Sequence, residues 1–579
     1  MPQPTSLGDY ADFYRQSIAP DTREAFWLEQ ARAIDWHQAP QQACYYHNPP
    51  FARWFADGQL NLCHNAVDRH LAQRADQPAI IAVSTETNTE RVYTFAQLHE
   101  EVQRMAAVLQ SFGVGKGDRV QIYMPMIAEA AFAMLACVRL GAIHSVVFGG
   151  FASVSLASRI DDAQPKVVIS ADAGSRGGKA IAYKPLLDEA LQLAKHKPAA
   201  VLLVDRGLAP MPLQAGRDHL WSTLRTQPQF SEAKVPCTWL NSSDPSYILY
   251  TSGTTGKPKG VQRDTGGYAV ALASSMQHIF AGKAGQTFFT TSDIGWVVGH
   301  SYIVYGPLIA GMATIMYEGL PTRPDAGIWW SLVEKYRVSH MFSAPTAVRV
   351  LKKQDPAYLK KYDLSSLQAL WLAGEPLDQP TAQWISGALQ VPIIDNYWQT
   401  ETGWPILTLC NGVEQQTSRF GSPGKAVYGF NVKLIDEATG QALTEPNQKG
   451  VLAMEGPLPP GCLQTVWGDD ERFVNTYWSS IPGRQIYSTF DWGIQDADGY
   501  YFILGRTDDV INVAGHRLGT REIEESISSH NGIAEVAVVG VADKLKGQVA
   551  MAFAVARDAN QVADASEFIH FACTSEDIN

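Results

Sequence analysis

Residues 118–151 read in order as a strand, a helix and a second strand. Apolar runs predict strands at 119–123 and 143–148, and the residues between them predict a helix at about 127–140 that ends before Gly141. Parallel strands need such a crossover, and the helices then cover the sheet. The runs PKVVISAD and AAVLLVD repeat the strand signal. We therefore predict an α/β fold with parallel-rich sheets whose ligand loops lie at the carboxyl ends of strands.

A polar run at 505–509 marks the predicted domain boundary. A chain of 579 residues is too long for one hydrophobic core. Beyond the run, the pattern predicts a helix at about 520–530 and an apolar strand at 535–541. We predict a large N-terminal domain at 1–507, which holds most ligand contacts, and a small, mobile and incomplete α+β domain at 508–579.

The N-terminal segment resembles a helical extension more than a targeting signal. Residues 10–36 carry apolar side chains at spacings that suit short amphipathic helices packed on a larger body. No basic region followed by an apolar stretch opens the chain, and no apolar run is long enough to span a bilayer. We expect a cytoplasmic protein without a membrane partner.

Charge and cysteine spacing exclude several classes of protein. The net charge of −12, with Lys and Arg scattered along the chain, argues against a nucleic-acid partner. The seven cysteines are odd in number, widely separated and never in C-x-x-C spacing. This pattern disfavours metal clusters and disulfide frameworks, and it predicts reduced, structural thiols.

The stretch YILYTSGTTGKPKGVQRDTGG at 247–267 joins an apolar strand signal to a loop rich in Ser, Thr, Gly and Lys. Such a loop is typical of a phosphate-binding cradle. It is not a Walker A loop, because Gly253 and Gly256 enclose only two residues and Lys257 precedes Pro258, which has no backbone N–H. The pattern predicts phosphate binding and counts against a kinase-like ATPase.

The stretch NYWQTETGWP at 396–405 places aromatic, amide, hydroxyl and carboxylate side chains together. Tyr397 and Trp398 could wall a flat ring or a small acyl pocket, and Glu401 could hold Mg²⁺ through oxygen. The alternative is a strand-to-turn segment whose aromatic residues belong to the core.

Two later stretches carry groups suited to a nucleotide. In YSTFDWG, Asp491 could accept the hydroxyls of a ribose, although an Asp before Trp-Gly is more often a turn residue. In GRTDDVINVAGHRLGTREIE, Arg506 and Arg517 suit phosphate oxygens, although isolated arginines are more often surface ion pairs.

These four stretches, in this order, resemble the core motifs of the acyl-adenylate-forming superfamily, and the resemblance covers nearly the whole chain. Four further motifs resemble those of its short-chain acyl-CoA synthetases: FGGF (148–151), SRGGKAI (175–181), WVVGHSYIVYGPL (296–308) and AGEP (373–376). The stretch VQRDTGGYAVAL (261–272) is most similar to propionate-activating members. The resemblance implies ATP-dependent ligation of propionate to CoA through propionyl-AMP, with AMP and pyrophosphate as products. The alternatives are acetate–CoA ligation and a non-catalytic nucleotide and CoA binder.

The resemblance also assigns residues to the ligands ATP, CoA and Mg²⁺. It implies that the phosphates of ATP contact Thr251, Ser252, Gly253, Thr254, Thr255, Gly256 and Lys257. It implies that adenine and the α-phosphate contact Gly374, Glu375, Pro376, Asp395, Asn396, Tyr397, Trp398, Gln399 and Thr400. Asp491 takes the ribose, Arg506 and Arg517 face ribose and phosphate, and Glu401 faces Mg²⁺. Glu401, Arg517 and Lys259 are the implied catalytic residues.

The remaining assignments concern CoA, the acyl group, the hinge and a second cation. CoA is expected near Arg176, Lys179, Thr322, Ala514 and Gly515, and the acyl pocket is expected between Val297, Val298, Ala373 and Trp398. Asp508 matches the hinge about which the small domain rotates. Ser528, His530 and Ile533 match a further cation site, with a surface histidine as the alternative for His530.

The C-terminal sequence departs from the expected pattern. From about residue 557 the resemblance is predicted to end, and no Pro-Lys-Thr-x-Ser-Gly-Lys segment occurs there. Lys544 and Lys546 lie in a loop that does not match this segment. Because its second lysine would stabilise the adenylation transition state, we expect the chain as written to adenylate propionate poorly.

Overall fold

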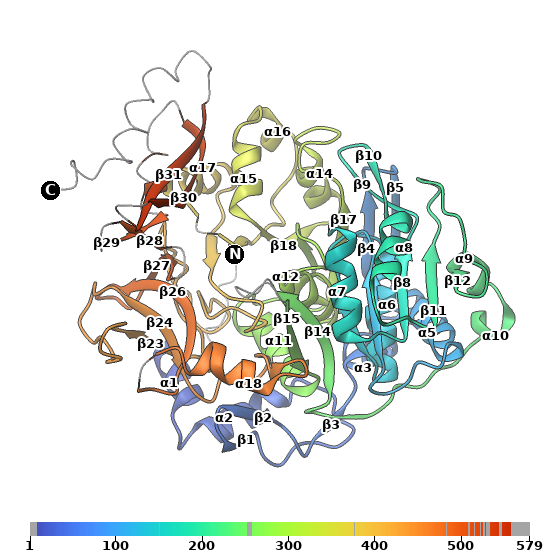
Figure 1. Ribbon diagram of the computed structural model, residues 1–579, viewed down its shortest axis with the longest axis horizontal. Coiled ribbons are helices and arrows are strands. Elements are labelled where there is room, and N and C mark those ends of the chain that lie inside the picture. The colour runs from blue at the N-terminus through green and yellow to red at the C-terminus, as the bar shows by residue number, and fades with distance from the viewer. Residues whose placement is uncertain are drawn as a thin grey trace. The chain divides into compact units, whose positions relative to one another are not determined.

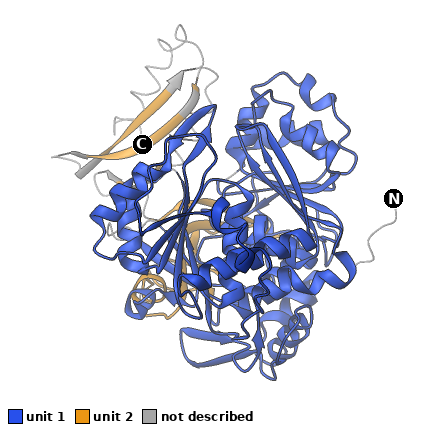
Figure 2. Ribbon diagram, turned by 90° about the vertical axis from the view of Figure 1, so that its right-hand side faces the viewer, with its two compact units in different colours: residues 1–431, 456–474 blue, residues 432–455, 475–579 orange. Residues whose placement is uncertain are grey.

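A computed structural model describes most of the chain (Figure 1), which divides into two compact units. The first unit comprises residues 1–431 and 456–474, and the second comprises 432–455 and 475–579 (Figure 2). The predicted boundary at 507 falls inside the second unit, and the predicted domains stay a prediction. The structure describes residues 8–149, 151–251, 258–375, 377–481, 483–507, 510–513, 516–520, 523–524, 527, 533–543 and 547–556.

An eight-stranded sheet forms one half of the first unit. Its strands from β12 to β14 are parallel, and β15 and β25 continue it antiparallel. The strand order is β12 (Asp218–Leu220), β11 (Ala200–Val204), β8 (Val167–Ala171), β6 (Arg119–Tyr123), β7 (Ile143–Val146), β14 (Pro245–Thr251), β15 (Lys259–Asp264) and β25 (Thr465–Val466). The predicted parallel sheet is thus confirmed.

The predicted crossover joins β6 to β7 through helix α6 (Ala128–Leu140). Gly141 ends this helix with φ 71°, a left-handed conformation that glycine adopts without strain. β7 stops two residues before the predicted end of its strand, since Phe148 and Gly149 leave the sheet to line a cavity. Helices α7 (Ser153–Ala163) and α8 (Tyr183–Leu193) cover the same sheet through a buried apolar cluster.

A seven-stranded sheet forms the other half of the first unit. All of its pairs are parallel except β4 with β5. The strand order is β20 (Ile393–Asn396), β19 (Ala369–Ala373), β18 (Val338–Ser343), β16 (Thr287–Thr290), β17 (Ala313–Glu318), β4 (Pro78–Ser84) and β5 (Thr89–Thr94). A core around Trp329 and Trp330 packs three helices on this sheet: α14 (Ile328–Lys335), α15 (Pro345–Lys352) and α17 (Gln379–Leu389). Helix α5 (Phe95–Ser111) packs on both α6 and β4, so these helices lie between the two sheets.

The N-terminal segment forms the expected amphipathic helices, α1 (Tyr10–Ile18) and α2 (Arg23–Ala31). Trp27 of α2 is fully buried, with its ring edge-on to Trp404 at 6.4 Å between centroids. Aromatic packing of this kind contributes about 0.5–1.5 kcal/mol beyond area burial. The extension is therefore part of the core of the first unit.

The second unit contains two antiparallel sheets. One has the order β23 (Asn431–Ile435), β24 (Gly450–Glu455), β26 (Tyr487–Gln495) and β27 (Tyr501–Arg506), and the other has β29 (His516–Gly519), β28 (Val510–Val513), β31 (Gly547–Ala556) and β30 (Ile533–Asp543). β28 and β29 pair antiparallel, and β30 contains the expected strand at 535–541. Most of the predicted helix at 520–530 lies outside the described residues.

Helix α11 (Gly266–His278) begins at a buried carboxylate in the first unit. Asp264 Oδ1 accepts a hydrogen bond of 3.0 Å from the backbone N–H of Tyr268. Burial raises the pKa of Asp264 to about 7. The backbone hydrogen bonds from Tyr268 and Gly267 and the charge of Arg263 oppose this shift only in part. The two glycines of the sequence DTGG are needed here, because a Cβ at Gly266 would lie 1.8 Å from Ser242 Oγ.

We expect Asp264→Asn to stabilise the protein more at pH 8 than at pH 5. In the unfolded protein the carboxyl of Asp264 titrates near pH 3.9. Between pH 4 and pH 7 the folded protein therefore keeps a proton on Asp264 that the unfolded protein has released. The free energy of unfolding of the unsubstituted protein consequently falls as pH rises through this range. From pH 5 to pH 8 the advantage of the variant should grow by about 3 kcal/mol. Urea denaturation at both pH values measures it. Asp436→Asn, at a partly exposed carboxyl, is the control, and an Asp264→Asn effect independent of pH would contradict the prediction.

Candidate active site

The ends of β14 and β15 frame the predicted phosphate loop. The two strands pair antiparallel with Thr251 opposite Lys259, so the loop leaves the sheet at the carboxyl end of β14. Residues 252–257, which carry most of the predicted phosphate contacts, lie outside the described residues. Thr251 Oγ1 is buried and has no hydrogen-bond partner within the described part of the chain. A buried orphan hydroxyl is costly, and a ligand oxygen would satisfy it.

Two of the predicted catalytic residues lie together. Lys259 Nζ is 3.9 Å from Glu401 Oε1, and their side chains are only 14% and 12% exposed. Lys259 opens β15, whereas Glu401 follows β20 of the other sheet. The first unit therefore places a cation and a carboxylate beside the end of the phosphate loop.

The segments at 374–375 and 396–401 are neighbours because β19 and β20 are adjacent and parallel. Ala373 pairs with Asn396 at their carboxyl ends. Gly374 has φ 103° and an open space where a Cβ would lie. Asn396 Nδ2 donates to Leu372 O at 3.0 Å, which binds the two strand ends to each other. The predicted adenine-binding segments thus share one sheet edge.

Glu375 is held by neighbouring side chains. Its Oε2 accepts from Arg349 Nη1 at 2.7 Å, and its Oε1 accepts from the N–H of Thr346 at 2.7 Å. Burial disfavours the charged carboxyl, but these partners outweigh it and hold the pKa of Glu375 below its usual value. The side chain is an anchored carboxylate. Pro376 lies outside the described residues.

Arg263 is a central residue that sequence reasoning missed. It is fully buried, and its Nη1 donates to Glu401 O at 2.8 Å and to Gly461 O at 2.7 Å. Its Nη2 donates to Thr400 O, and its Nε donates to Tyr247 Oη at 3.1 Å. One guanidinium therefore anchors the backbone of two predicted site residues. The local sequence VQRD carries no signal that separates this arginine from an ordinary strand residue.

Trp398 lies against two aromatic residues at the predicted acyl pocket. Its ring centroid is 5.5 Å from that of Tyr302 and 6.3 Å from that of Phe342, with the latter ring stacked at 22°. Tyr302 belongs to the π-helical turn η2 (His300–Tyr305), which continues α12 (Val297–Gly299). Ala373 is buried at 8% exposure and ends β19, beside the strand of Phe342. The four predicted wall residues therefore come from neighbouring elements.

A cavity of about 380 Å³ lies in the first unit beside this region. Arg176, predicted for CoA, lines it together with Trp296, the residue before α12. Lys179 pairs with Arg176 across the hairpin of β9 (Ala173–Arg176) and β10 (Lys179–Ala182). Thr322 follows Pro321, another lining residue. The predicted CoA residues of this unit thus gather at or beside one cavity.

Asp293 is a second site residue that sequence reasoning missed. It lines the same cavity, and its Oδ1 accepts from the N–H of Gly295 at 2.7 Å. Burial raises the pKa of Asp293 to about 6, opposed by that hydrogen bond and by the charge of Arg176. Nothing in the local pattern TSDIG separates such a carboxyl from an ordinary turn residue.

In the second unit, two predicted nucleotide ligands lie on paired strands. Asp491 of β26 is opposite Arg506 of β27, and Asp491 is 8% exposed whereas Arg506 is exposed. Ile533 begins β30 with its side chain in the core. The side chain of Arg517 is not described, and the following predicted residues lie outside the described part of the chain: Asp508, Ala514, Gly515, Ser528 and His530.

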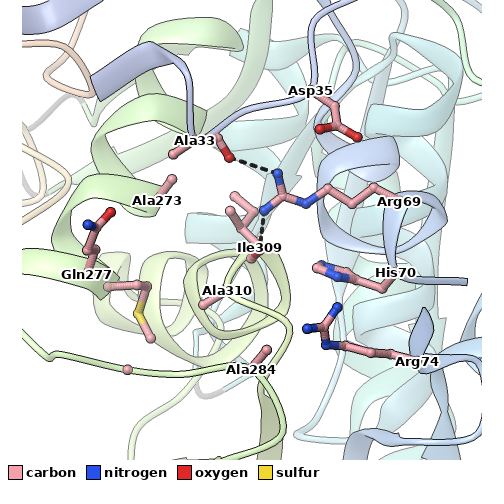
Figure 3. A pocket seen from close by; sticks show the side chains of 12 residues that line it. Ala33, Asp35, Arg69, His70, Arg74, Ala273, Gln277, Ala284, Ile309 and Ala310 are labelled. Atoms are coloured by element: carbon pink, nitrogen blue, oxygen red, sulfur yellow. Dashed lines mark hydrogen bonds between the residues drawn. The ribbon is translucent and has the colours of Figure 1, made fainter. Parts of the chain in front are cut away.

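A separate cavity of about 460 Å³ contains none of the predicted site residues (Figure 3). Arg69 donates across it to Ala33 O at 2.9 Å and to Ile309 O. His70 also lines it and is buried, and burial lowers its pKa to about 4. The arginine is thus engaged by backbone carbonyls.

Among the described residues, no helix is both long and apolar enough to cross a membrane.

Three family models match the sequence. The model of the AMP-binding enzyme matches residues 67–461, and that of the acetyl-coenzyme A synthetase N-terminus matches residues 10–66. The model of the AMP-binding enzyme C-terminal domain matches residues 522–576. The similarity therefore continues beyond residue 557, and the prediction that it ends there was wrong.

Named relatives cover almost the whole chain. The propionate–CoA ligases of Escherichia coli (strain K12) and Salmonella typhimurium are each 64% identical over 555 residues, which is 96% of this chain and 87% of each relative. The mitochondrial acyl-CoA synthetase short-chain family member 3 of Homo sapiens is 44% identical over 558 residues, which is 95% of this chain and 80% of that protein.

Proposed function

The chain belongs to the AMP-binding enzyme family, and from this we propose that it is an AMP-forming propionate–CoA ligase. The observation that carries the proposal is 64% identity to two bacterial propionate–CoA ligases over 96% of the chain. Its substrates are then the small molecules propionate, ATP and CoA. We also propose a cytoplasmic location, where ATP and CoA are supplied.

The reaction runs in two displacements. A propionate oxygen attacks the α-phosphorus of ATP, and the bond to pyrophosphate breaks. The CoA sulfur then attacks the carbonyl carbon of propionyl-AMP, the thiol loses its proton, and AMP leaves. The carboxylate needs this activation because oxide is a poor leaving group. The protein contributes chiefly by positioning the reactants and stabilising charge at phosphorus.

The residues around the phosphate loop suit the first displacement. Lys259 offers a positive charge for phosphate oxygens, and the buried hydroxyl of Thr251, which has no hydrogen-bond partner among the described residues, offers a donor at the end of β14. Glu401 offers the oxygen ligand that Mg²⁺ prefers, and we propose that it holds this ion. When bound, Mg²⁺ supplies charge neutralisation at the phosphates. The buried Arg263 keeps the backbone of Glu401 in place.

The nucleoside and CoA assignments extend the proposal. Asp491 and Arg506, paired across β26 and β27, are proposed for the ribose, and Arg176 and Asp293 are proposed to line the path of CoA. The resemblance supports the roles proposed for the other residues, which are phosphate binding by Arg517, hinge motion at Asp508, CoA contact at Ala514 and Gly515, and a cation at Ser528, His530 and Ile533.

Propionate-dependent exchange of pyrophosphate into ATP tests the proposed adenylation. We expect propionate-dependent exchange at the low rate predicted from the sequence and, with CoA added, formation of propionyl-CoA and AMP. A series of acids from acetate to valerate then ranks the acyl preference. Release of ADP, or exchange that does not depend on an acid, would overturn the proposal.

We expect Ala373→Val to shift preference from propionate toward acetate. Ala373 is buried at the end of β19, and two added methyl groups would take the space of the terminal carbon of propionate. One methylene is discriminated by about 10–200-fold, so kcat/KM for propionate relative to acetate should fall by at least about tenfold. Ala369→Val, at the other end of the same strand, controls for general packing effects. An unchanged ratio would remove Ala373 from the acyl pocket.

A further inference from the structure

Two cysteines far apart in sequence meet beside one carboxylate. Cys63 lies in α3 (Leu62–Ala66), Asp68 opens the short helix η1 (Asp68–His70), and Cys237 lies 169 residues after Asp68. Their Sγ and carboxylate oxygen atoms all lie within 4.8 Å of one another. Asp68 Oδ2 is 3.9 Å from Cys63 Sγ and 3.8 Å from Cys237 Sγ. Both cysteines are free thiols, as the sequence predicts, but their spacing in the sequence does not show that they meet.

Arg139 of α6 places a positive charge against Cys63 and Asp68 of this cluster. Its Nη1 lies 2.8 Å from Asp68 Oδ2 and 3.5 Å from Cys63 Sγ, and its Nη2 lies 3.0 Å from Asp68 Oδ1. Its Nε donates to Val235 O at 2.6 Å, which fixes the guanidinium near the segment of Cys237. A metal ion on the two sulfurs would face this buried positive charge. The geometry thus favours thiol chemistry over metal binding.

The charges around the sulfurs are balanced without a further ligand. Burial disfavours charge on Asp68, but hydrogen bonds from His99 and Arg139 outweigh burial and hold the pKa of Asp68 well below its usual range. The adjacent Cys63 sulfur and burial raise the pKa of Cys237, so Cys237 remains a protonated thiol. Arg139, in contact with Cys63 Sγ, would stabilise negative charge that develops on that sulfur as it reacts.

We propose that Cys63 and Cys237 form a reversible disulfide when the protein meets hydrogen peroxide. Cys63 Sγ attacks one peroxide oxygen, the O–O bond breaks, and a sulfenic acid and one water form. Cys237 Sγ then attacks the sulfenic sulfur, the S–O bond breaks, and hydroxide leaves with the proton of Cys237 as a second water. The two thiols lose two electrons and two protons, and peroxide is reduced to water. Cys63 is fully buried and Cys237 is partly exposed, so we propose that peroxide reaches the pair from the side of Cys237.

The bond would join two distant parts of the first unit. It would tie α3 to the segment just before β13 (Leu240–Asn241) and would close a chain loop of more than 169 residues. In the chain-entropy account, long loops stabilise most when they are closed. Neither cysteine lines the cavity that holds Arg176 and Asp293, so the inference is independent of the proposed ligase activity.

Peptide mapping of the peroxide-treated protein under non-reducing conditions tests the proposal. We expect the loss of two thiols, a mass lower by two hydrogens, and a cross-linked peptide pair containing Cys63 and Cys237 that dithiothreitol separates. Cys237→Ser should prevent the cross-link and leave a sulfenic acid that dimedone traps, whereas Cys44→Ser should preserve the cross-link.

Fully reduced peptides after treatment, or cross-links through other cysteines, would overturn the proposal. Stoichiometric zinc in the purified protein, lost in Cys237→Ser, would overturn it in favour of a metal site. Propionyl-CoA formation measured in parallel reports separately on the ligase function.

Discussion

Replacing Arg263 by methionine should lower both the stability of the protein and its rate of propionate activation. The guanidinium satisfies the carbonyls of Thr400, Glu401 and Gly461 and the hydroxyl of Tyr247 in a fully buried place. The carbonyl of Glu401 keeps a hydrogen bond from the N–H of Leu463, but each of the other groups left without a partner costs about 1–3 kcal/mol, so the free energy of unfolding should fall by several kcal/mol. Urea denaturation measures this loss.

The same change should reduce kcat/KM for pyrophosphate release by about 100-fold or more, because a misplacement of about 1 Å has that effect. Leu187→Ala, a core truncation in α8, serves as a matched control, since it should cost about 2–5 kcal/mol without touching the 400–401 backbone. Arg263→Lys keeps the charge but lacks the planar fork, so it should restore only part of the rate. If Arg263→Met and Leu187→Ala lose the same small fraction of activity well below their unfolding temperatures, Arg263 has no positioning role.

Replacing Trp398 by glycine should open the acyl pocket to longer acids. The indole lies against Tyr302 and Phe342, beside the strand that ends at Ala373, where its removal would leave space that propionate cannot fill. Valerate is two methylenes longer than propionate, and each buried methylene is discriminated by at least about tenfold. The ratio of kcat/KM for valerate to that for propionate should therefore rise by about 100-fold.

Kinetics with the acids from acetate to valerate measure this ratio in both proteins. Trp384→Ala, which removes a half-buried tryptophan from α17, controls for the loss of aromatic packing elsewhere and should leave the ratio unchanged. Valerate that stays inert while propionate activity is preserved would mean that Trp398 belongs only to the core.

Local patterns were sufficient for much of the fold. The strand, helix and strand at 119–148 follow from apolar runs, helical spacing and the terminal Gly141, and the structure contains β6, α6 and β7 there. These features depend on neighbours within a few residues along the chain. The order of the phosphate-loop and aromatic motifs also indicated the family, because each motif is continuous in sequence.

The tertiary structure alone decided which distant side chains meet. Strand order brings Lys259 to Glu401 and carries the buried Arg263 to the backbone of that glutamate. The packing of α3, α6 and the segment before β13 brings Cys63 to Cys237, a proximity that their spacing of 174 residues in the sequence does not reveal. The periodicity of apolar residues predicts which face of a helix or strand is buried, but not which other element packs against that face. The free-energy cost of burying a charged side chain depends on the groups that pack around it. The contacts of the candidate site and the thiol pair therefore arise only once the sheets and helices have packed.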